Sequence, residues 1–213
     1  MPPLRSKVEV GPTEARFYDV FLDVISLGYY PYLIGKVIDK MDIQPGQSIL
    51  DFGSGTGRND CFIARKIGLD GSILGLDISK EMLSLSRKHC QSYPNVEFRE
   101  QRIEMPLTYQ EEFDRVFTSF VLHGFEDAEK IRIISNAYRA LKPGGVFCIL
   151  DYNEFDLERL WFPLRWAFIR GECQLALEFL RLDLKEMLSS QGFTSFEEEP
   201  FLRGHLRLLK TAK

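Results

Sequence analysis

The feature that most constrains this chain is an apolar run that leads into three alternating glycines. The run Ile49–Phe52 contains Asp51 and continues as Gly53-Ser54-Gly55-Thr56-Gly57. Glycine lets a backbone turn sharply and lets a ligand approach the main chain. A helix that follows presents unpaired N–H groups, which suit an anionic group. The segment therefore predicts a strand, a ligand-binding loop and a helix, as nucleotide-binding α/β folds begin.

Strand and helix patterns alternate through the middle of the chain. Short apolar runs predict strands, and apolar residues at helical spacing predict helices. The predicted strands are Ser48–Phe52, Ser72–Leu76, Val96–Arg99, Phe113–Ser119 and Val146–Leu150, the predicted helices are Asn59–Ile67, Ser79–His89 and Asp127–Leu141, and Lys142–Gly145 is a predicted turn. This alternation predicts a doubly wound, mostly parallel α/β sheet with helices on both faces.

The two ends of the chain depart from this rhythm. A single domain of 213 residues accommodates them around the α/β core. The expected parts are an N-terminal helical lid over 1–44 with helices at Ala15–Ile25 and Pro31–Met41, a core over 45–152, a helical insert over 153–182, and a C-terminal part over 183–213 with a helix at Asp183–Gln191 and an antiparallel hairpin from Phe196–Phe201 and His205–Thr211. The hairpin brings the predicted sheet to seven strands.

Composition excludes several classes of protein. The formal net charge is −4, whereas nucleic-acid binders usually carry a basic excess or a basic stripe. The N-terminus lacks the apolar core of a signal peptide, and no apolar run approaches the length of a membrane span. The four cysteines, at 61, 90, 148 and 173, form no CxxC pair. This argues against a zinc site and a disulfide framework, and reduced cysteines suit a cytoplasmic protein.

An acidic residue ends the second predicted strand. Asp77 lies 20 residues after Gly57, where a carboxylate can accept hydrogen bonds from ribose hydroxyls. The alternative is that Asp77 caps the next helix, but Ser79 is better placed for that role, which leaves Asp77 free. The glycine spacing is G-x-G-x-G, tighter than the G-x-G-x-x-G of dinucleotide-binding folds, and Arg58 takes the place of the third glycine.

Four segments in this order resemble the class I S-adenosylmethionine (AdoMet)-dependent methyltransferases, and most closely the ubiquinone/menaquinone C-methyltransferase-like group. They are Leu50–Gly57, Leu76–Leu83, Phe113–Val116 and Leu141–Gly145, while Phe17-Tyr18-Asp19 and Leu27-Gly28-Tyr29 are similar to the helical lid of that group. The resemblance implies a Rossmann-like methyltransferase fold, AdoMet as the methyl donor and S-adenosylhomocysteine (AdoHcy) as the product.

The resemblance also implies a role for each matching position. The loop Gly53-Ser54-Gly55-Thr56-Gly57 would wrap the methionine part of AdoMet, and Asp51 would hold the loop and reach the amino group. Asp77 would bind the ribose, and Ile78 would pack on the adenine. Tyr18 of the lid and Ser119 complete this part of the expected cofactor site.

One segment departs from the family pattern. Many relatives place an acidic residue against the adenine amino group, where this chain reads Gln101-Arg102-Ile103-Glu104. Arginine has no acceptor, so its side chain cannot replace that contact. The backbone groups of Arg102 and Ile103 are therefore expected to recognise the adenine edge.

The segment after the fourth predicted strand, Ser119–His123, is expected to border the transferred methyl group, because ligands of open α/β sheets sit at the carboxyl ends of strands. His123 is the candidate catalytic base, since its unperturbed pKa lies near neutrality. The alternative is that it helps cap the helix after Glu126-Asp127. The aromatic stretch Leu160–Arg170 has three interpretations: an acceptor pocket, transient contact with a membrane surface, or a helix packed on the core.

Three functions remain in competition. The first is AdoMet-dependent methylation of a small, partly apolar acceptor that resembles a quinone, a lipid or another small metabolite. The second is a nucleotide-dependent oxidoreductase using NAD, and the third is a non-catalytic AdoMet-binding protein. No metal is expected, because no cluster of His, Cys and carboxylates has ligand spacing. Nucleic acid is the least favoured partner, and the oligomeric state stays open.

Overall fold

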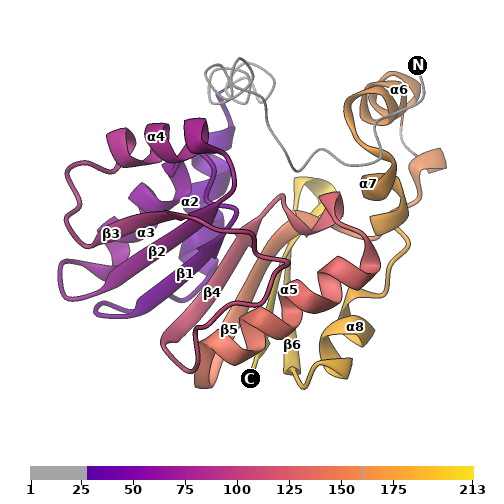
Figure 1. Ribbon diagram of the computed structural model, residues 1–213. Helices are drawn as coiled ribbons and strands as arrows, with labels where there is room; N and C mark the ends of the chain where they lie inside the picture. The colour runs from indigo at the N-terminus through magenta and orange to yellow at the C-terminus, as the bar shows by residue number, and fades with distance from the viewer. Residues whose placement is uncertain (1–27, 160) are drawn as a thin grey trace.

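The computed structural model describes residues 28–159 and 161–213 (Figure 1). The expected helix at Ala15–Ile25, with Tyr18, lies outside these residues. The described elements, in chain order, are α2 (Tyr30–Lys40), β1 (Ser48–Phe52), α3 (Arg58–Ile67), β2 (Ser72–Asp77), α4 (Lys80–His89), β3 (Val96–Glu100), β4 (Phe113–Ser119), η1 (Leu122–Gly124), α5 (Asp127–Ala140), β5 (Leu141–Tyr152), η2 (Leu157–Arg159), α6 (Phe162–Gly171), α7 (Gln174–Phe179), α8 (Leu184–Ser190), β6 (Thr194–Phe201), η3 (Leu202–Gly204) and β7 (Leu206–Ala212).

The strands form one seven-stranded sheet in the order β3-β2-β1-β4-β5-β7-β6. The first five strands are parallel, and β7 is antiparallel to both β5 and β6. This confirms the doubly wound sheet and the C-terminal hairpin. The chain moves outward from β1 to β3 and then returns to β4 on the other side of β1. The carboxyl ends of β1 and β4 are therefore neighbours at a topological switch point, where ligands of such sheets bind.

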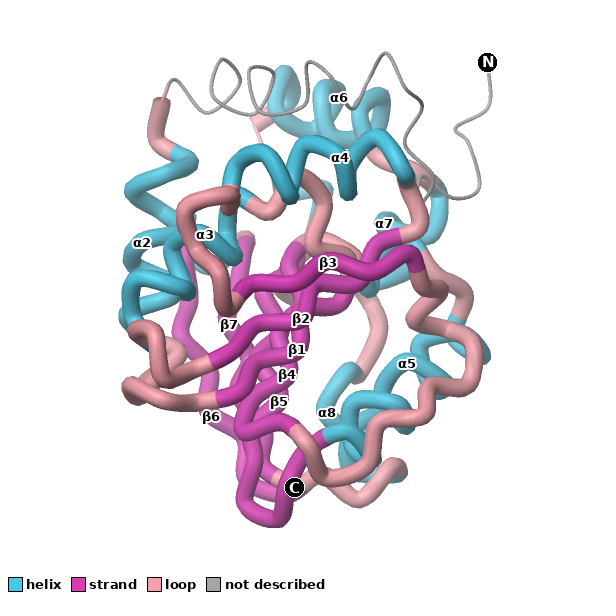
Figure 2. Tube along the Cα trace, turned by 60° about the vertical axis from the view of Figure 1, so that its left-hand side comes forward, coloured by secondary structure: helices cyan, strands magenta, loops and turns pink. Residues whose placement is uncertain are grey.

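Alternation along the strands builds a core on each face of the sheet. Ile49 of β1 packs with α2 and α3, whereas its neighbour Leu50 packs with α5 and α8. The same period of two places Phe117 on the first face and Val116 on the second, as expected of strands buried on both sides. Figure 2 shows α2 and α3 on one side of the strands with α5 and α8 on the other.

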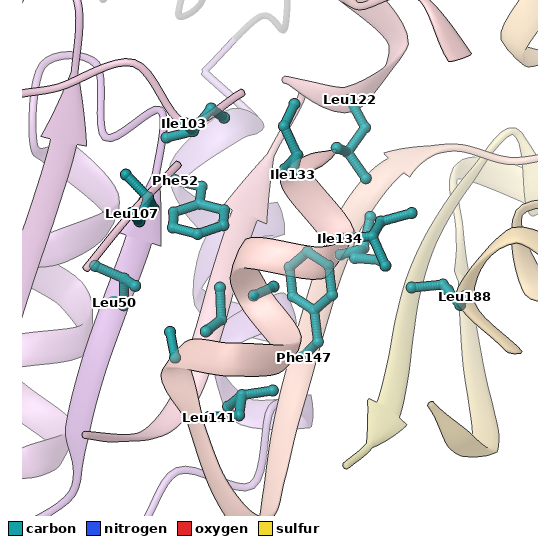
Figure 3. Packing of buried hydrophobic residues seen from close by; sticks show 14 of the residues in the cluster. Leu50, Phe52, Ile103, Leu107, Leu122, Ile133, Ile134, Leu141, Phe147 and Leu188 are labelled. Carbon is teal, nitrogen blue, oxygen red and sulfur yellow. The ribbon is translucent and has the colours of Figure 1, made fainter. Parts of the chain in front are cut away.

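Figure 3 shows the second of these cores from close by. Ile133 and Ile134 of α5 point toward Phe52 and Phe147 of the sheet, and Leu188 of α8 closes the cluster. Burial of each such side chain contributes about 1.5–3 kcal/mol. This packing holds β1, β4 and β5 rigidly, so the loops at their carboxyl ends have fixed positions.

The prediction of a separate turn at Lys142–Gly145 is wrong. These residues lie inside β5, which begins at Leu141 and pairs with β4 from its first residue. Leu141 pairs with Phe113 and Val146 pairs with Arg115, so the register shifts between them. The stretch is thus an irregularity within a strand. Proline followed by two glycines is typical of a turn, which is why the sequence predicted one.

The cysteines supply a second correction. Cys61 of α3 and Cys90, the C-cap of α4, form a disulfide, whereas Cys148 and Cys173 are free and buried. The two bonded residues are 29 positions apart and become neighbours only because α3 and α4 pack together. The expectation of reduced cysteines is wrong for this pair. A cytoplasmic location therefore stays a prediction, and among the cysteines only Cys148 and Cys173 are consistent with it. No helix in the described ranges has the length and apolar character to cross a bilayer.

Candidate active site

The glycine loop between β1 and α3 has three glycines in the left-handed region, with φ values of 77° at Gly53, 53° at Gly55 and 72° at Gly57. A Cβ at Gly53 would lie 2.5 Å from Val121, and a Cβ at Gly57 would lie 2.7 Å from Ser86. A Cβ at Gly55 would meet no atom within 4 Å. The first and third glycines are therefore required by packing within the chain, whereas Gly55 exposes its backbone to open space that a ligand can use.

Asp77 supports this loop from the end of β2. Its carboxylate accepts a hydrogen bond from the Gly55 N–H at 2.9 Å and another from the Ser79 N–H at 2.8 Å. Ser79 caps α4 as expected, because its side chain accepts from Met82 N. Asp77 therefore does not cap α4, as expected, but two backbone amides already donate to its carboxylate. Carboxylate oxygens have about four lone-pair sites, so Asp77 retains acceptor capacity.

The segment after β3 lies beside Asp77, because the Gln101 N–H donates to the Asp77 carbonyl at 3.0 Å. Arg102 is exposed and its guanidinium pairs with Glu104. Ile103 is buried, and its carbonyl accepts from Asn136 Nδ2 at 2.7 Å. Part of the backbone expected to recognise adenine is thus already bonded within the protein. Ile78, which follows Asp77, is half-buried.

Two acidic side chains meet beneath the glycine loop. Asp51 of β1 and Asp60 of α3 are 2% and 0% exposed and are within hydrogen-bonding contact. Burial raises the pKa of Asp51 to about 7 and raises that of Asp60 as well. The hydroxyl oxygens of Ser54 and Ser119 are also buried there, without a partner among the described residues.

His123 lies beyond the end of β4, on η1. Its Nδ1 is 2.7 Å from Asp151 Oδ1, and its backbone N–H donates to the other oxygen of Asp151 at 3.2 Å. Burial lowers the pKa of His123, but the Asp151 carboxylate, helped by Glu172, outweighs this effect and raises the pKa above its usual value. The capping alternative for His123 is wrong, because Glu126 and Glu129 form a capping box at the start of α5.

Aromatic and acidic side chains lie near Nε2, the other ring nitrogen of His123. Nε2 lies 3.8 Å from Glu172 Oε2, and the Tyr152 hydroxyl donates to Glu172 Oε1 at 2.7 Å. The His123 ring centroid is 5.0 Å from that of Tyr152 and 6.5 Å from that of Phe179. The arrangement places an imidazole nitrogen beside both a carboxylate and aromatic rings.

The helical insert turns much of its aromatic surface outward. Trp161, Phe162 and Trp166 are 73%, 75% and 55% exposed, so the interpretation of this stretch as a core helix is wrong for them. Phe168 packs instead, with its ring centroid 5.1 Å from that of Tyr152. Figure 1 places α6 and α7 on the other side of the molecule from α2, α3 and α4.

Sequence reasoning missed three residues of this site: Asp60, Asp151 and Glu172. One signal was available, because Asp151 directly follows a predicted strand just as Asp77 does. Asp60 looks like an ordinary acidic residue in the first turn of a helix. Within the described ranges, no three His, Cys, Asp or Glu side chains gather in a way that could hold a metal ion.

Known proteins are similar to this chain in sequence and in fold. A methyltransferase domain family model matches residues 49–145. An uncharacterized methyltransferase from Synechocystis sp. is 29% identical over 174 residues, which cover 81% of this chain and 79% of that protein. The ubiquinone/menaquinone biosynthesis C-methyltransferase of Klebsiella pneumoniae is 31% identical over 146 residues, covering 67% of this chain but only 57% of that protein.

A solved structure extends the likeness of the fold to the ends of the chain. The SAM-dependent methyltransferase from Aquifex aeolicus has a TM-score of 0.69 at 17% identity, and the match covers 96% of this chain and 98% of that one. The sheet order, the open glycine loop and these likenesses agree with one another. The chain belongs to the class I AdoMet-dependent methyltransferases.

Proposed function

We propose that this protein transfers the methyl group of AdoMet to a small, partly apolar acceptor that binds beside His123. The observation that carries the proposal is the His123–Asp151 pair at 2.7 Å. It stands at the carboxyl ends of β4 and β5, next to the glycine loop that follows β1.

The described residues fit the cofactor. Gly55 has open space at its Cα, and Ser54, Ser119 and the acidic pair below the loop have buried oxygens that lack donors. Gly53–Gly57 would hold the methionine part, Asp51 its amino group, Asp77 the ribose and Ile78 the adenine. The backbone of Arg102 and Ile103 would border the adenine edge, and Tyr18 lies outside the described residues.

His123 would remove the acceptor's proton. The contact with Asp151 assigns the proton of the neutral ring to Nδ1, so Nε2 carries the lone pair. Glu172, 3.8 Å from Nε2, stabilises the imidazolium that forms. Bound AdoMet supplies a methyl group on a sulfonium, a good leaving group, and the protein contributes orientation, water exclusion and proton removal. The acceptor is then a phenol, a thiol or an acidic carbon.

The acceptor proposed is quinone-like, lipid-like or a similar small metabolite. The aromatic rings of Tyr152, Phe168 and Phe179 near His123 suit an apolar ligand. The exposed Trp161 and Trp166 on α6, with Arg170 stacked 5.1 Å from the Trp166 ring centroid, suit transient contact with an anionic membrane surface. The name of the Klebsiella relative points to the same acceptor class.

The test has two stages. Thermal shift with AdoMet, AdoHcy and NAD, each added separately, separates methyltransferase from oxidoreductase: AdoMet and AdoHcy should stabilise the protein, and NAD should not. A screen of cell extract with methyl-labelled AdoMet should then give a labelled small molecule that partitions into organic solvent. AdoMet binding with no labelled product in any fraction would favour a non-catalytic AdoMet-binding protein.

A further inference from the structure

We propose that Asp60 and Asp51 form a proton-sharing carboxyl pair that receives the α-ammonium group of the cofactor, and that the pair releases a proton when this cation binds. The inference rests on the proposed function, since it concerns the same cofactor. It assigns a role to Asp60, a residue of α3 that no sequence motif marked.

The geometry of the pair is unusual for acidic side chains. Asp60 is 0% exposed and Asp51 is 2% exposed, and no cation of the described residues perturbs the pKa of either. Apart from Asp51 and its own backbone N–H, Asp60 has no hydrogen-bond donor among the described residues. Asp51 Oδ1 also lacks a donor. Two buried carboxylates in contact cannot both ionise without a counter-charge, so one proton stays between them.

Over residues 28–159 and 161–213, the groups around the pair add no compensating cation. Asp77 approaches from β2, and its charge raises the pKa of Asp51 further. Arg58 precedes Asp60 by two residues, but its guanidinium lies over the Tyr30 ring of α2, 5.5 Å from the ring centroid. The Tyr30 hydroxyl donates to Asn59 rather than to either acid. The described residues that face the pair thus supply no positive charge, and the source proposed here is a cation of the ligand.

The position of the pair indicates which ligand group supplies that charge. Asp51 is two residues before Gly53, and Asp60 is three residues after Gly57, so the pair lies directly under the loop with the open Gly55 position. The methionine part of AdoMet or AdoHcy carries a primary ammonium. When it reaches the pair, both acids ionise, the shared O–H bond breaks and the proton passes to solvent. Burial, which raises both pKa values, makes this release measurable near neutral pH.

The main experiment measures proton release during binding. Calorimetric titrations of the whole protein with AdoHcy, in buffers of different ionisation enthalpy at about pH 6.5, should show release of roughly half to one proton. The desamino analogue of AdoHcy, an adenosyl thioether of butanoic acid, should release clearly less. Any proton lost from Asp77 on ribose binding is common to both ligands and cancels. Equal release by the two ligands, or none by either, would overturn the proposal.

The variant Asp60→Asn tests the residue itself. AdoHcy should then bind about 10- to 150-fold more weakly at about pH 8, as expected for lost bonds to a charged group, and its excess proton release should vanish. Affinity for the desamino analogue should not change. Asp70→Asn, an exposed change in the loop after α3, is the matched control and should behave as the wild type. Unchanged AdoHcy affinity and proton release in Asp60→Asn would contradict the proposal.

A stability measurement keeps the test independent of binding. A pKa raised in the folded state contributes stability below the unfolded pKa, near 3.9 for Asp, and that stability is lost as pH rises through the folded pKa. The ligand-free wild type should therefore lose Tm relative to Asp60→Asn as pH rises from about 6 to about 8. Equal Tm profiles would show that no proton is held there. If AdoHcy does not bind the wild type at all, the proposed function fails rather than this assignment.

Discussion

The half of the site built by β1, β2 and α3 differs sharply from the half built by η1 and the insert. In the first half, backbone amides and buried carboxylates surround the glycine loop, and Asp77 joins that loop to α4. In the second half, aromatic rings gather around His123 while Trp161 and Phe162 remain exposed. A rigid polar cradle suits a cofactor that never varies, whereas aromatic surface suits an acceptor whose chemistry differs between enzymes.

The comparison makes its strongest prediction at Gly55. Gly55→Val should reduce AdoHcy affinity below detection, about 100-fold or more, because the side chain fills the open space that the cofactor needs. The fold should survive, since a Cβ there meets no atom of the chain within 4 Å. Calorimetry for binding and circular dichroism for folding provide the measurements.

The control for this change is Gly68→Val at the other end of α3. Gly68 also has a positive φ, 68°, and also has no atom within 4 Å of a built Cβ. Both variants place a side chain at positive φ, a strain of about 1–3 kcal/mol, and Gly68, with a ψ of −171°, carries at least as much of it as Gly55. Only Gly55→Val should lose the cofactor. Equal loss in both variants would mean that backbone strain, and not blocked space, weakens binding.

In the acceptor half, His123→Ala should lower kcat by about 10²- to 10⁴-fold, the usual contribution of a general base. AdoHcy affinity should stay within about twofold of the wild type, because His123 belongs to the other half of the site. Asp151→Asn should also lower kcat, since it removes the negative charge beside Nδ1 that orients the ring and stabilises its protonated form. Unchanged turnover in His123→Ala on the identified acceptor would remove the base assignment.

The pH profile gives an independent readout for His123. The base is active when neutral, and Asp151 with Glu172 raises its pKa against burial, so kcat/KM should rise with pH through a value above about 6.5. The stability consequence has the opposite direction. A raised folded pKa contributes stability below the unfolded pKa, and this contribution is lost as pH rises through the folded pKa. Glu172→Gln should move the kcat/KM limb to lower pH.

Sequence alone predicted the elements around the glycine loop far better than the contacts around His123, for a physical reason. Local signals determine strands and loops: the observed bounds of β1 and β4 are those predicted, and Ser79 caps α4 as expected. Contacts between side chains of different elements have no such local signal. His123 meets Asp151 across 28 residues, and Cys61 meets Cys90 across 29, only after the helices and strands have packed. The exposure of Trp161 could not be predicted from sequence either, because the apolar residues of α6 are not confined to one side of the helix.

The disulfide offers a prediction confined to the cofactor half. Cys61→Ser should lower the free energy of unfolding by roughly 3–4 kcal/mol, the chain-entropy value for a loop of this length. Cys90 Sγ lies 3.2 Å from the Gly57 carbonyl oxygen, so loss of the disulfide that fixes Cys90 should also lower AdoHcy affinity a few-fold. Denaturant unfolding and calorimetry are the measurements. Treatment with a reductant should lower the stability of the wild type but not that of Cys61→Ser.

The smallest effects are expected on the exposed face of α6. Trp161→Ala and Trp166→Ala should leave Tm within about 2 °C of the wild type, because surface changes usually cost under about 0.5 kcal/mol. Cofactor affinity should be unchanged, while acceptor affinity or sedimentation with anionic phosphatidylglycerol vesicles should fall several-fold. Phe168→Ala is the control from the same helix, since Phe168 packs on Tyr152 and its loss should lower Tm. Loss of folding in both tryptophan variants would contradict the exposure of these side chains. Normal acceptor and vesicle binding in both variants would place the acceptor surface elsewhere.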